Sequence, residues 1–167
     1  LGRPGCGLLP IRGHSNVQGV GSVGVTPVLK QAFAERMREL YGIEPAHAPG
    51  WDTFSSMQAA AEGRVQVAFL LGGNLFASNP DRAWAARALG NVPLTIYAST
   101  KLNEGHVHGR GRTSLVLPVL ARDEETQATT QESMFNFVRL SEGGAAASGD
   151  EMRSEVDILA ALAERVL

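Results

Sequence analysis

The chain has 167 residues, of which 44% are hydrophobic and 19% charged, enough apolar material for one domain with its own core. Its net charge of -2 argues against binding to duplex nucleic acid, and no apolar run approaches the roughly 18 residues that span a membrane. Because Cys6 is the single cysteine, an internal disulfide and a cysteine metal cluster are excluded, and a reducing, cytoplasmic location is expected. The sequence starts at Leu1 with what reads as the middle of a loop, so we expect a segment of a longer polypeptide.

The first part of the chain is rich in glycine and then predicts a helix. Residues 1–24 are expected to be irregular, apart from a short strand at 8–11. Thr26 and Pro27 form a typical helix start, because threonine caps helices and proline fits the first helical position. Apolar residues follow at helical spacing, and Gly42 is a natural stop.

A second helix and the first strand of a sheet are expected next. The helix begins at Asp52 or Thr53, has Phe54 on its apolar face and ends at Gly63. The nearly continuous apolar run 65–71 then predicts a strand covered on both faces, as in a parallel sheet.

The rest of the chain alternates helices and strands. Asn79-Pro80-Asp81 opens a third helix, which stops at Gly90. Further elements are predicted by their apolar patterns: strands at 94–98, 114–117 and 135–140, a short helix within 99–113 and an amphipathic helix at 151–166. This alternation with short connections predicts an α/β fold, a Rossmann-like three-layer domain with a mostly parallel sheet.

Ligands of such a sheet bind beyond the carboxyl ends of its strands, so the loops after Ile11, Leu71 and Ala98 are candidate sites. The loop after Leu71 starts with two glycines, which let a ligand approach the main chain. The loop after Ala98 offers hydroxyls, an amide and a cation, which suit phosphate, sugar or base edges. An ordinary strand-to-helix turn and a solvated loop are the open alternatives for these two segments.

Two further patterns are weaker. Residues 19–24 match the dinucleotide fingerprint G-x-G-x-x-G before a helix, but a polar stretch stands where the fingerprint requires a strand. A flexible glycine loop explains the same residues. In an extended segment His106 and His108 would point to one side, yet a catalytic zinc needs three protein ligands and no third is evident. We therefore predict no metal site.

Several motifs, taken in order, resemble the molybdopterin-dependent oxidoreductases, in particular the branch that contains formate dehydrogenase alpha subunits. The pattern GxPGxG…RGxxNVQG of that family is matched by residues 2–7 and 12–19. Further matches follow in the family's order: LGGN at 71–74, SNPD at 78–81, STKLN at 99–103 with His106 after it, and LVLP at 115–118. Each motif is short, but the ordered set covers essentially the whole of 2–167.

The resemblance implies a cofactor and the residues that bind it. In that family the catalytic subunit holds molybdenum through molybdopterin guanine dinucleotide, and a Rossmann-like domain cradles one dinucleotide with its strand-end loops. Residues 1–120 would form this domain, and 121–167 a returning segment with the C-terminal helix, packed on the same domain or belonging to a neighbouring one. The implied contacts are Arg12, Gly13, His14, Ser15, Asn16 and Gln18 on the pterin or pyrophosphate side, Gly72, Gly73 and Asn74 under the dinucleotide, and Ser99, Thr100 and Lys101 at the guanosine.

The same resemblance places the redox chemistry elsewhere. We expect no catalytic residue and no metal ligand in this chain, because the family's metal-ligating residue and any iron–sulfur cluster lie upstream of the matching segment. The expected partners are the remaining domains of the parent subunit and a small-molecule redox substrate such as formate. Two alternatives stay open from the residues alone: an NAD-binding module based on 19–24, and a non-catalytic interaction domain.

Overall fold

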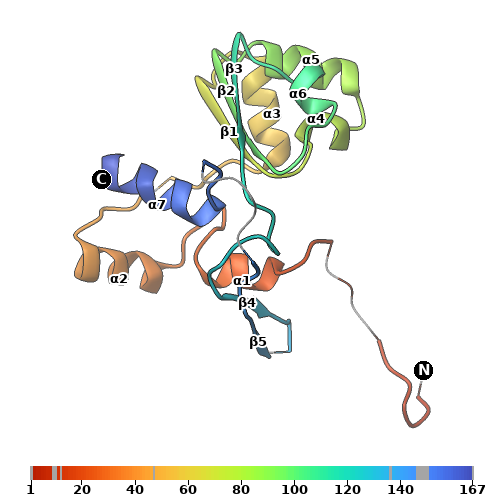
Figure 1. Ribbon diagram of the computed structural model, residues 1–167, viewed down its shortest axis with the longest axis vertical. Helices are drawn as coiled ribbons and strands as arrows, with labels where there is room; N and C mark the ends of the chain where they lie inside the picture. Colours follow the sequence, from red (N-terminus) through yellow and green to blue (C-terminus); the bar gives the residue numbers. More distant parts are fainter. Residues whose placement is uncertain are drawn as a thin grey trace. The chain divides into compact units, whose positions relative to one another are not determined.

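The computed structural model describes residues 2–8, 11, 13–46, 48–135, 137–145 and 151–166 (Figure 1). The chain forms two compact units. The first unit comprises Leu1–Ala48 and Ala128–Glu142, and the second comprises Pro49–Gln127 and Gly143–Leu167. The two units are defined by contacts within the chain and do not correspond to the predicted domains 1–120 and 121–167. That division therefore stays a prediction.

The second unit is built on a three-stranded parallel sheet. Its strands are β1 (Val67–Leu71), β2 (Leu94–Ser99) and β3 (Thr113–Pro118), in the order β1-β2-β3. Each connection carries helical segments, as parallel strands require a crossover. The predicted α/β class with a Rossmann-like parallel sheet is confirmed, and the strand boundaries agree with the predicted ones to within two residues.

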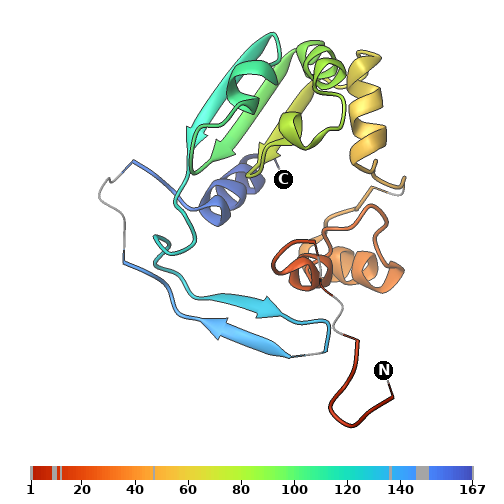
Figure 2. The same ribbon diagram turned by 90° about the vertical axis from the view of Figure 1, so that its right-hand side faces the viewer.

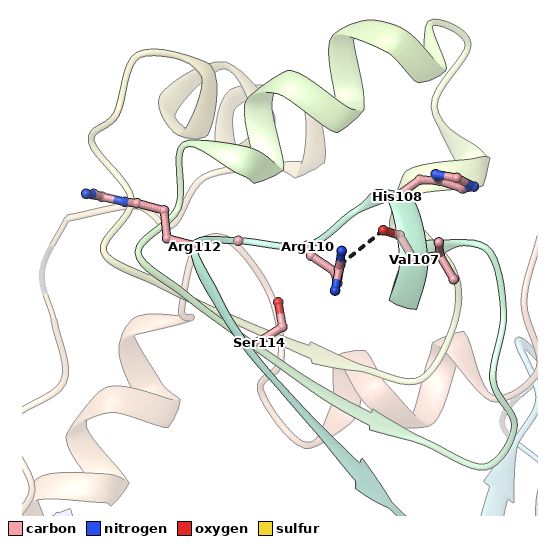
Figure 3. A pocket seen from close by; sticks show the side chains of 6 residues that line it. Val107, His108, Arg110, Arg112 and Ser114 are labelled. Atoms are coloured by element: carbon pink, nitrogen blue, oxygen red, sulfur yellow. Dashed lines mark hydrogen bonds between the residues drawn. The ribbon is translucent and has the colours of Figure 1, made fainter.

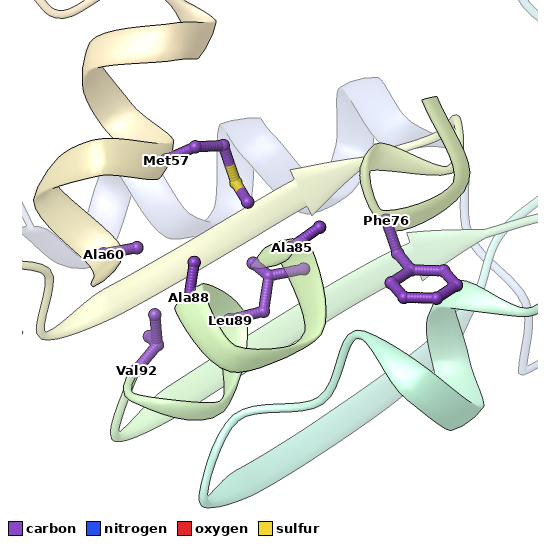
Figure 4. Close-up of a cluster of buried hydrophobic side chains, with 7 residues drawn as sticks. All are labelled: Met57, Ala60, Phe76, Ala85, Ala88, Leu89 and Val92. Atoms are coloured by element: carbon purple, nitrogen blue, oxygen red, sulfur yellow. The ribbon is translucent and has the colours of Figure 1, made fainter. Parts of the chain in front are cut away.

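Four helices cover one face of this sheet (Figure 2). They are α3 (Thr53–Ala61), α4 (Leu75–Ser78), α5 (Arg82–Gly90) and α6 (Gly105–His108). Figure 4 shows the apolar cluster that α3, α4 and α5 build over the strands: Met57, Ala60, Phe76, Ala85, Ala88, Leu89 and Val92. Small alanines at the contact between α3 and α5 let these two helices lie close together, so the core is compact there.

The opposite face of the sheet is apolar but only partly covered. Val67, Leu71 and Leu115 point there and keep 54%, 44% and 48% of their surface exposed. In Figure 4, α7 (Glu155–Val166) lies on this side, behind the strands. Ile158 and Ala161 of that helix are half-buried, whereas Val156, Leu159, Leu162 and Val166 are exposed. The predicted coverage of both faces is met by β2, whose residues are all buried or half-buried, whereas β1 and β3 keep exposed side chains.

Side-chain caps fix the helix starts around the sheet. The Asp52 carboxylate accepts a hydrogen bond from the Ser55 N–H at 2.7 Å, which confirms the predicted start of α3. Asp81 accepts from the Trp84 N–H at 2.8 Å, so α5 begins just after the predicted Asn-Pro-Asp start. Phe54, which we predicted on the apolar face of α3, is 70% exposed, whereas Met57 on the same helix is buried.

The first unit contains α1 (Val17–Ser22), α2 (Gln31–Tyr41) and an antiparallel hairpin of β4 (Thr129–Glu132) and β5 (Val138–Ser141). Helix α2 begins later than predicted, because the Thr26 hydroxyl donates to the Val28 carbonyl oxygen and does not cap a helix. Gly42 ends α2 with a φ of 66°, as predicted.

Two predictions for the start of the chain differ from the structure. Helix α1 occupies a segment that we expected to be irregular. Of the predicted strand 8–11, Leu8 and Ile11 are not in a strand, and residues 9 and 10 lie outside the described residues. Among the helices that the structure describes, none is both long and apolar enough to cross a membrane.

Candidate functional site

A pocket of about 390 Å³ lies at the carboxyl ends of β1 and β2 in the second unit. The loop after β1 contributes Gly72, Gly73 and Asn74, and the loop after β2 contributes Ser99, Thr100, Lys101, Leu102 and Asn103. Six of these eight residues were predicted as cofactor contacts. The structure thus brings two of the three predicted loops into one pocket, because the carboxyl ends of adjacent parallel strands meet at one edge of a sheet.

Two consecutive glycines make the turn that opens the pocket floor. Gly72 and Gly73 have φ values of 66° and 68°, a region that other residues enter only with strain. The Gly72 N–H donates to the Ala98 carbonyl oxygen at 2.9 Å, which continues the β1–β2 ladder by one residue. No atom lies within 4 Å of a Cβ built on Gly73, so a ligand can reach its main chain.

Two asparagines hold the pocket loops. The Asn74 side chain accepts from the Ala77 N–H at 3.0 Å and so caps α4. The Asn103 amide nitrogen donates to the Gly73 carbonyl oxygen at 3.2 Å, and its Oδ1 accepts from the Gly105 N–H at 2.8 Å. One side chain thereby links the loop after β1, the loop after β2 and the start of α6.

A buried serine–histidine pair lies at the pocket wall. Ser99 and His106 are only 7% and 8% exposed, and the His106 Nε2 lies 3.0 Å from the Ser99 Oγ. The His106 Nδ1 accepts from the Asn103 N–H at 2.8 Å, and its ring packs on Tyr97 with 4.8 Å between ring centroids. Burial raises the pKa of Tyr97, whose hydroxyl donates to the Gly109 carbonyl oxygen at 2.5 Å.

The charges near the pocket are of both signs. Lys101 is exposed at its rim. Glu155 does not line the pocket, but one of its carboxylate oxygens lies 3.8 Å from a Cβ built on Gly72. Burial, and then repulsion by Glu125, raise the pKa of Glu155 above its ordinary value. A group that approaches Gly72 from the side of Glu155 therefore meets a partly buried carboxyl, whereas Lys101 favours an anion at the rim.

The other predicted contacts belong to the first unit. Gly13, His14 and Ser15 are exposed, and Arg12 lies outside the described residues. Gln18 lines a second pocket of about 400 Å³, beside α1. Whether these residues share a site with the pocket of the second unit stays a prediction.

Asn16 has a structural role in the first unit. Its amide nitrogen donates to the Thr130 carbonyl oxygen at 3.0 Å, and its Oδ1 accepts from the Glu132 N–H at 2.9 Å. The side chain therefore pairs with the main chain of β4 as a neighbouring strand would. Its φ of 56° is the left-handed conformation that asparagine tolerates better than most residues.

The two weaker patterns take unexpected conformations. In the G-x-G-x-x-G segment, Gly19 and Gly21 lie inside α1, and a Cβ on Gly24 would come within 2.7 Å of the Phe33 ring. No strand precedes this segment in the described part of the chain, so the geometry differs from a dinucleotide fingerprint. His106 and His108 lie in α6 and not in an extended segment, so they diverge: His106 contacts Ser99, and His108 packs beside Phe76.

A third pocket, of about 360 Å³, lies next to the start of β3 (Figure 3). Arg110 and Arg112 line it, and the Arg110 Nε donates to the Val107 carbonyl oxygen at 3.1 Å. This pocket is at the amino end of its strand, away from the edge where parallel sheets bind ligands. Among the described residues, no group of three or more His, Cys, Asp or Glu side chains is placed to hold a metal ion.

Comparison with known proteins connects the chain to larger proteins. No family model matches it. The chain is 38% identical over its whole length to Protein YdeP of Escherichia coli K12 and covers 23% of that protein. It is 39% identical to the protein named "Uncharacterized oxidoreductase Rv2900c" of Mycobacterium tuberculosis H37Rv, over 98% of the chain and 22% of the relative.

A third relative matches only part of the chain. The protein named "Putative formate dehydrogenase YrhE" of Bacillus subtilis is 33% identical over 78 residues, which are 42% of this chain and 8% of the relative. The chain thus spans less than a quarter of the length of these proteins, two of which have names of oxidoreductases.

Proposed function

We propose that this chain is the part of an oxidoreductase catalytic subunit that holds one end of a molybdopterin guanine dinucleotide, and that the complete protein is a formate dehydrogenase-like redox enzyme. The observation that carries the proposal is the pocket in which the Gly72–Asn74 and Ser99–Asn103 loops meet. The oxidoreductase names of two relatives support the reaction class. The cofactor itself is inferred from the ordered motifs of the sequence.

The pocket residues fit a nucleotide-sized group. Small-molecule pockets typically enclose about 300–1,000 Å³. The pocket of about 390 Å³ lies at the lower end, so it suits the guanosine end of the cofactor and not the whole dinucleotide. The open main chain at Gly73 permits close approach, Lys101 supplies a positive charge for a phosphate, and Ser99 and Thr100 supply hydroxyls for ribose or base.

The proposed division of labour follows from these residues. When bound, the cofactor would supply the two-electron redox chemistry, and the protein would supply binding and orientation. In this chain, the glycine turn and the loop after β2 would bind and orient the nucleotide. We assign no catalytic role to the pocket residues, and the proposed metal ligand and any iron–sulfur cluster would belong to other parts of a longer protein.

The proposed partners are further domains of the same subunit. The chain covers 23% of Protein YdeP, which leaves most of that relative outside the match. The exposed apolar face of the sheet, with Val67, Leu71 and Leu115, and the exposed apolar side chains of α7 are surfaces of the kind that neighbouring domains bury.

The test uses the full-length protein, purified without denaturation. We expect molybdenum or tungsten by mass spectrometry and GMP after acid release of the cofactor. Gly73→Ala should strongly lower the GMP content, because a Cβ at this position blocks the main chain. Gly63→Ala is the matched control: Gly63 has a φ of 72° and equally open surroundings, but it lies outside the pocket. Folded protein with neither metal nor guanine nucleotide would refute the proposal.

A further inference from the structure

Ser99 and His106 have the spacing of a nucleophile and its base. The Oγ-to-Nε2 distance of 3.0 Å is within the range in which histidine takes a proton from a serine. What the pair can do depends on which ring nitrogen carries the proton, and the contacts of the other nitrogen decide this.

The main chain at Asn103 fixes the tautomer of His106. A backbone N–H can only donate, and the Asn103 N–H points at the His106 Nδ1 at 2.8 Å. Nδ1 therefore accepts, and the ring proton lies on Nε2. In the competing tautomer, Nδ1–H would donate to the Asn103 carbonyl oxygen over a longer distance, 3.2 Å. The Nδ1–H would then also face the Asn103 N–H, and two donors would repel each other.

This tautomer reverses the direction of the Ser99 hydrogen bond. The His106 Nε2–H donates to Ser99 Oγ, so the imidazole has no lone pair left to take the serine proton. A serine hydroxyl carries one hydrogen of its own. Among the described residues His106 is the one hydrogen-bond partner of Ser99 Oγ, and Ser99 lines the pocket. The hydroxyl hydrogen is thus available to a ligand.

We propose that His106 is a positioning residue that turns the Ser99 hydroxyl proton into the pocket, so that Ser99 donates a hydrogen bond to an acceptor oxygen of the bound nucleotide. This inference rests on the proposed function, because it assigns a role within the same pocket. With its hydroxyl acting as a donor, Ser99 makes the adjacent part of the pocket selective for a ligand group that accepts a hydrogen bond. This arrangement also excludes a nucleophilic role for Ser99, although the pair looks like a catalytic dyad.

The experiment follows retention of the guanine nucleotide by the full-length protein during dialysis, measured as GMP released from the retained fraction. Ser99→Ala should lose nucleotide roughly 2–10-fold faster, the effect of one hydrogen bond. His106→Leu should lose it to a similar extent. His106→Gln, whose amide can still donate to Ser99 Oγ, should lie close to the wild type.

Two further variants separate positioning from general damage to the loop. In the double variant Ser99→Ala/His106→Leu, loss should be no faster than with Ser99→Ala alone, since His106 acts through Ser99. His108→Leu is the matched control two residues along α6, where the side chain packs beside Phe76 and should leave retention unchanged. Additive effects in the double variant, or retention in Ser99→Ala equal to wild type, would overturn the inference. A wild type without guanine nucleotide would instead refute the proposed function on which it rests.

Discussion

The Asn103 side chain and the Gly73 main chain are joined across the pocket by a hydrogen bond of 3.2 Å between Asn103 Nδ2 and the Gly73 carbonyl oxygen. These residues are 30 positions apart and follow different strands. The same side chain accepts from the Gly105 N–H, so its two ends hold the β1 loop and the start of α6 at a fixed separation. The shape of the pocket therefore depends on one half-buried amide.

Asn103→Asp tests this link. The variant keeps an oxygen for the Gly105 N–H but replaces the donor by an acceptor that faces the Gly73 carbonyl oxygen. We expect it to lower the free energy of unfolding by about 1 kcal/mol, the size of one such hydrogen bond. Retention of guanine nucleotide should fall as well. Denaturant unfolding and GMP content measure the two effects. Val107→Ala, in the neighbouring helix α6 with an exposed side chain outside this pocket, is the control. An Asn103→Asp variant as stable as wild type would show that the link is unimportant.

Glu155 should make stability depend on pH. Its pKa is raised by burial and then by repulsion from Glu125, so the folded state binds its proton more tightly than the unfolded state does. The contribution of Glu155 is therefore fully present below its ordinary pKa of 4.5 and is lost as the pH rises through the higher folded value. Glu155→Gln should stabilise the protein at pH 7 and make no difference below about pH 4.5.

Asp157 provides the control for this prediction. It lies in the same first turn of α7, where a negative charge is favoured by the helix dipole. Asp157→Asn should therefore leave stability at pH 7 unchanged or slightly lower. Unfolding curves recorded from pH 4 to pH 8 compare both variants with wild type, and a Glu155→Gln protein less stable than wild type at pH 7 would contradict the argument.

Asp52 should show the opposite dependence on pH. The Asp52 carboxylate accepts a hydrogen bond from the Ser55 N–H, and this bond lowers the pKa of the carboxyl below its ordinary value of 3.8. Its stabilising contribution is present above that value and is lost as the pH falls through the lower folded value. Asp52→Asn keeps a capping oxygen but loses the charge, so the variant should be less stable than wild type at pH 7. The difference should vanish as the pH falls through the lowered pKa of Asp52. Unfolding curves are recorded for both proteins over this pH range. If the difference in stability between them is the same at all pH values, the charge of Asp52 does not contribute to stability.

The sequence was most informative where a local signal coincided with the tertiary structure. Asp52 and Gly42 were recognisable as a helix start and a helix stop because capping depends on neighbouring residues alone. Helix α1 was missed because the glycines within 17–22 lower its intrinsic propensity. The contacts that hold its start come from β4, more than 110 positions away, and no local pattern reveals them.

The candidate site was predictable in its loops but not in its contacts. The loops after Leu71 and Ala98 follow from the rule that adjacent parallel strands present their carboxyl ends together, and the structure brings them into one pocket. The role of His106 was not predictable. An extended segment would have set it beside His108, whereas the helical turn of α6 directs it at Ser99, and the proton position follows only from its contact with the Asn103 N–H.

Asn16 should matter for stability through the hairpin. Its amide makes two hydrogen bonds to the main chain of β4, to the Thr130 carbonyl oxygen and from the Glu132 N–H. Asn16→Gly accepts the left-handed φ without strain and removes only the side chain, so it should cost about 1–2 kcal/mol. Hydrogen exchange of a peptide that covers 129–132 should become faster. If exchange there is unchanged, the pairing does not hold the hairpin.

Ser99 should be inert toward reagents that label nucleophilic serines. The His106 Nε2–H donates to the Ser99 hydroxyl and leaves it without a base, so a fluorophosphonate probe should not attach to it at pH 7. The measurement is mass spectrometry of the peptide that contains Ser99, after treatment of the native protein with excess probe. Ser114, whose hydroxyl pairs with Thr95 at 2.6 Å, gives the background level for a serine without a histidine partner. Labelling of Ser99 well above Ser114 would mean that the imidazole accepts the serine proton, and both the assigned tautomer and the donor role of Ser99 would then be wrong.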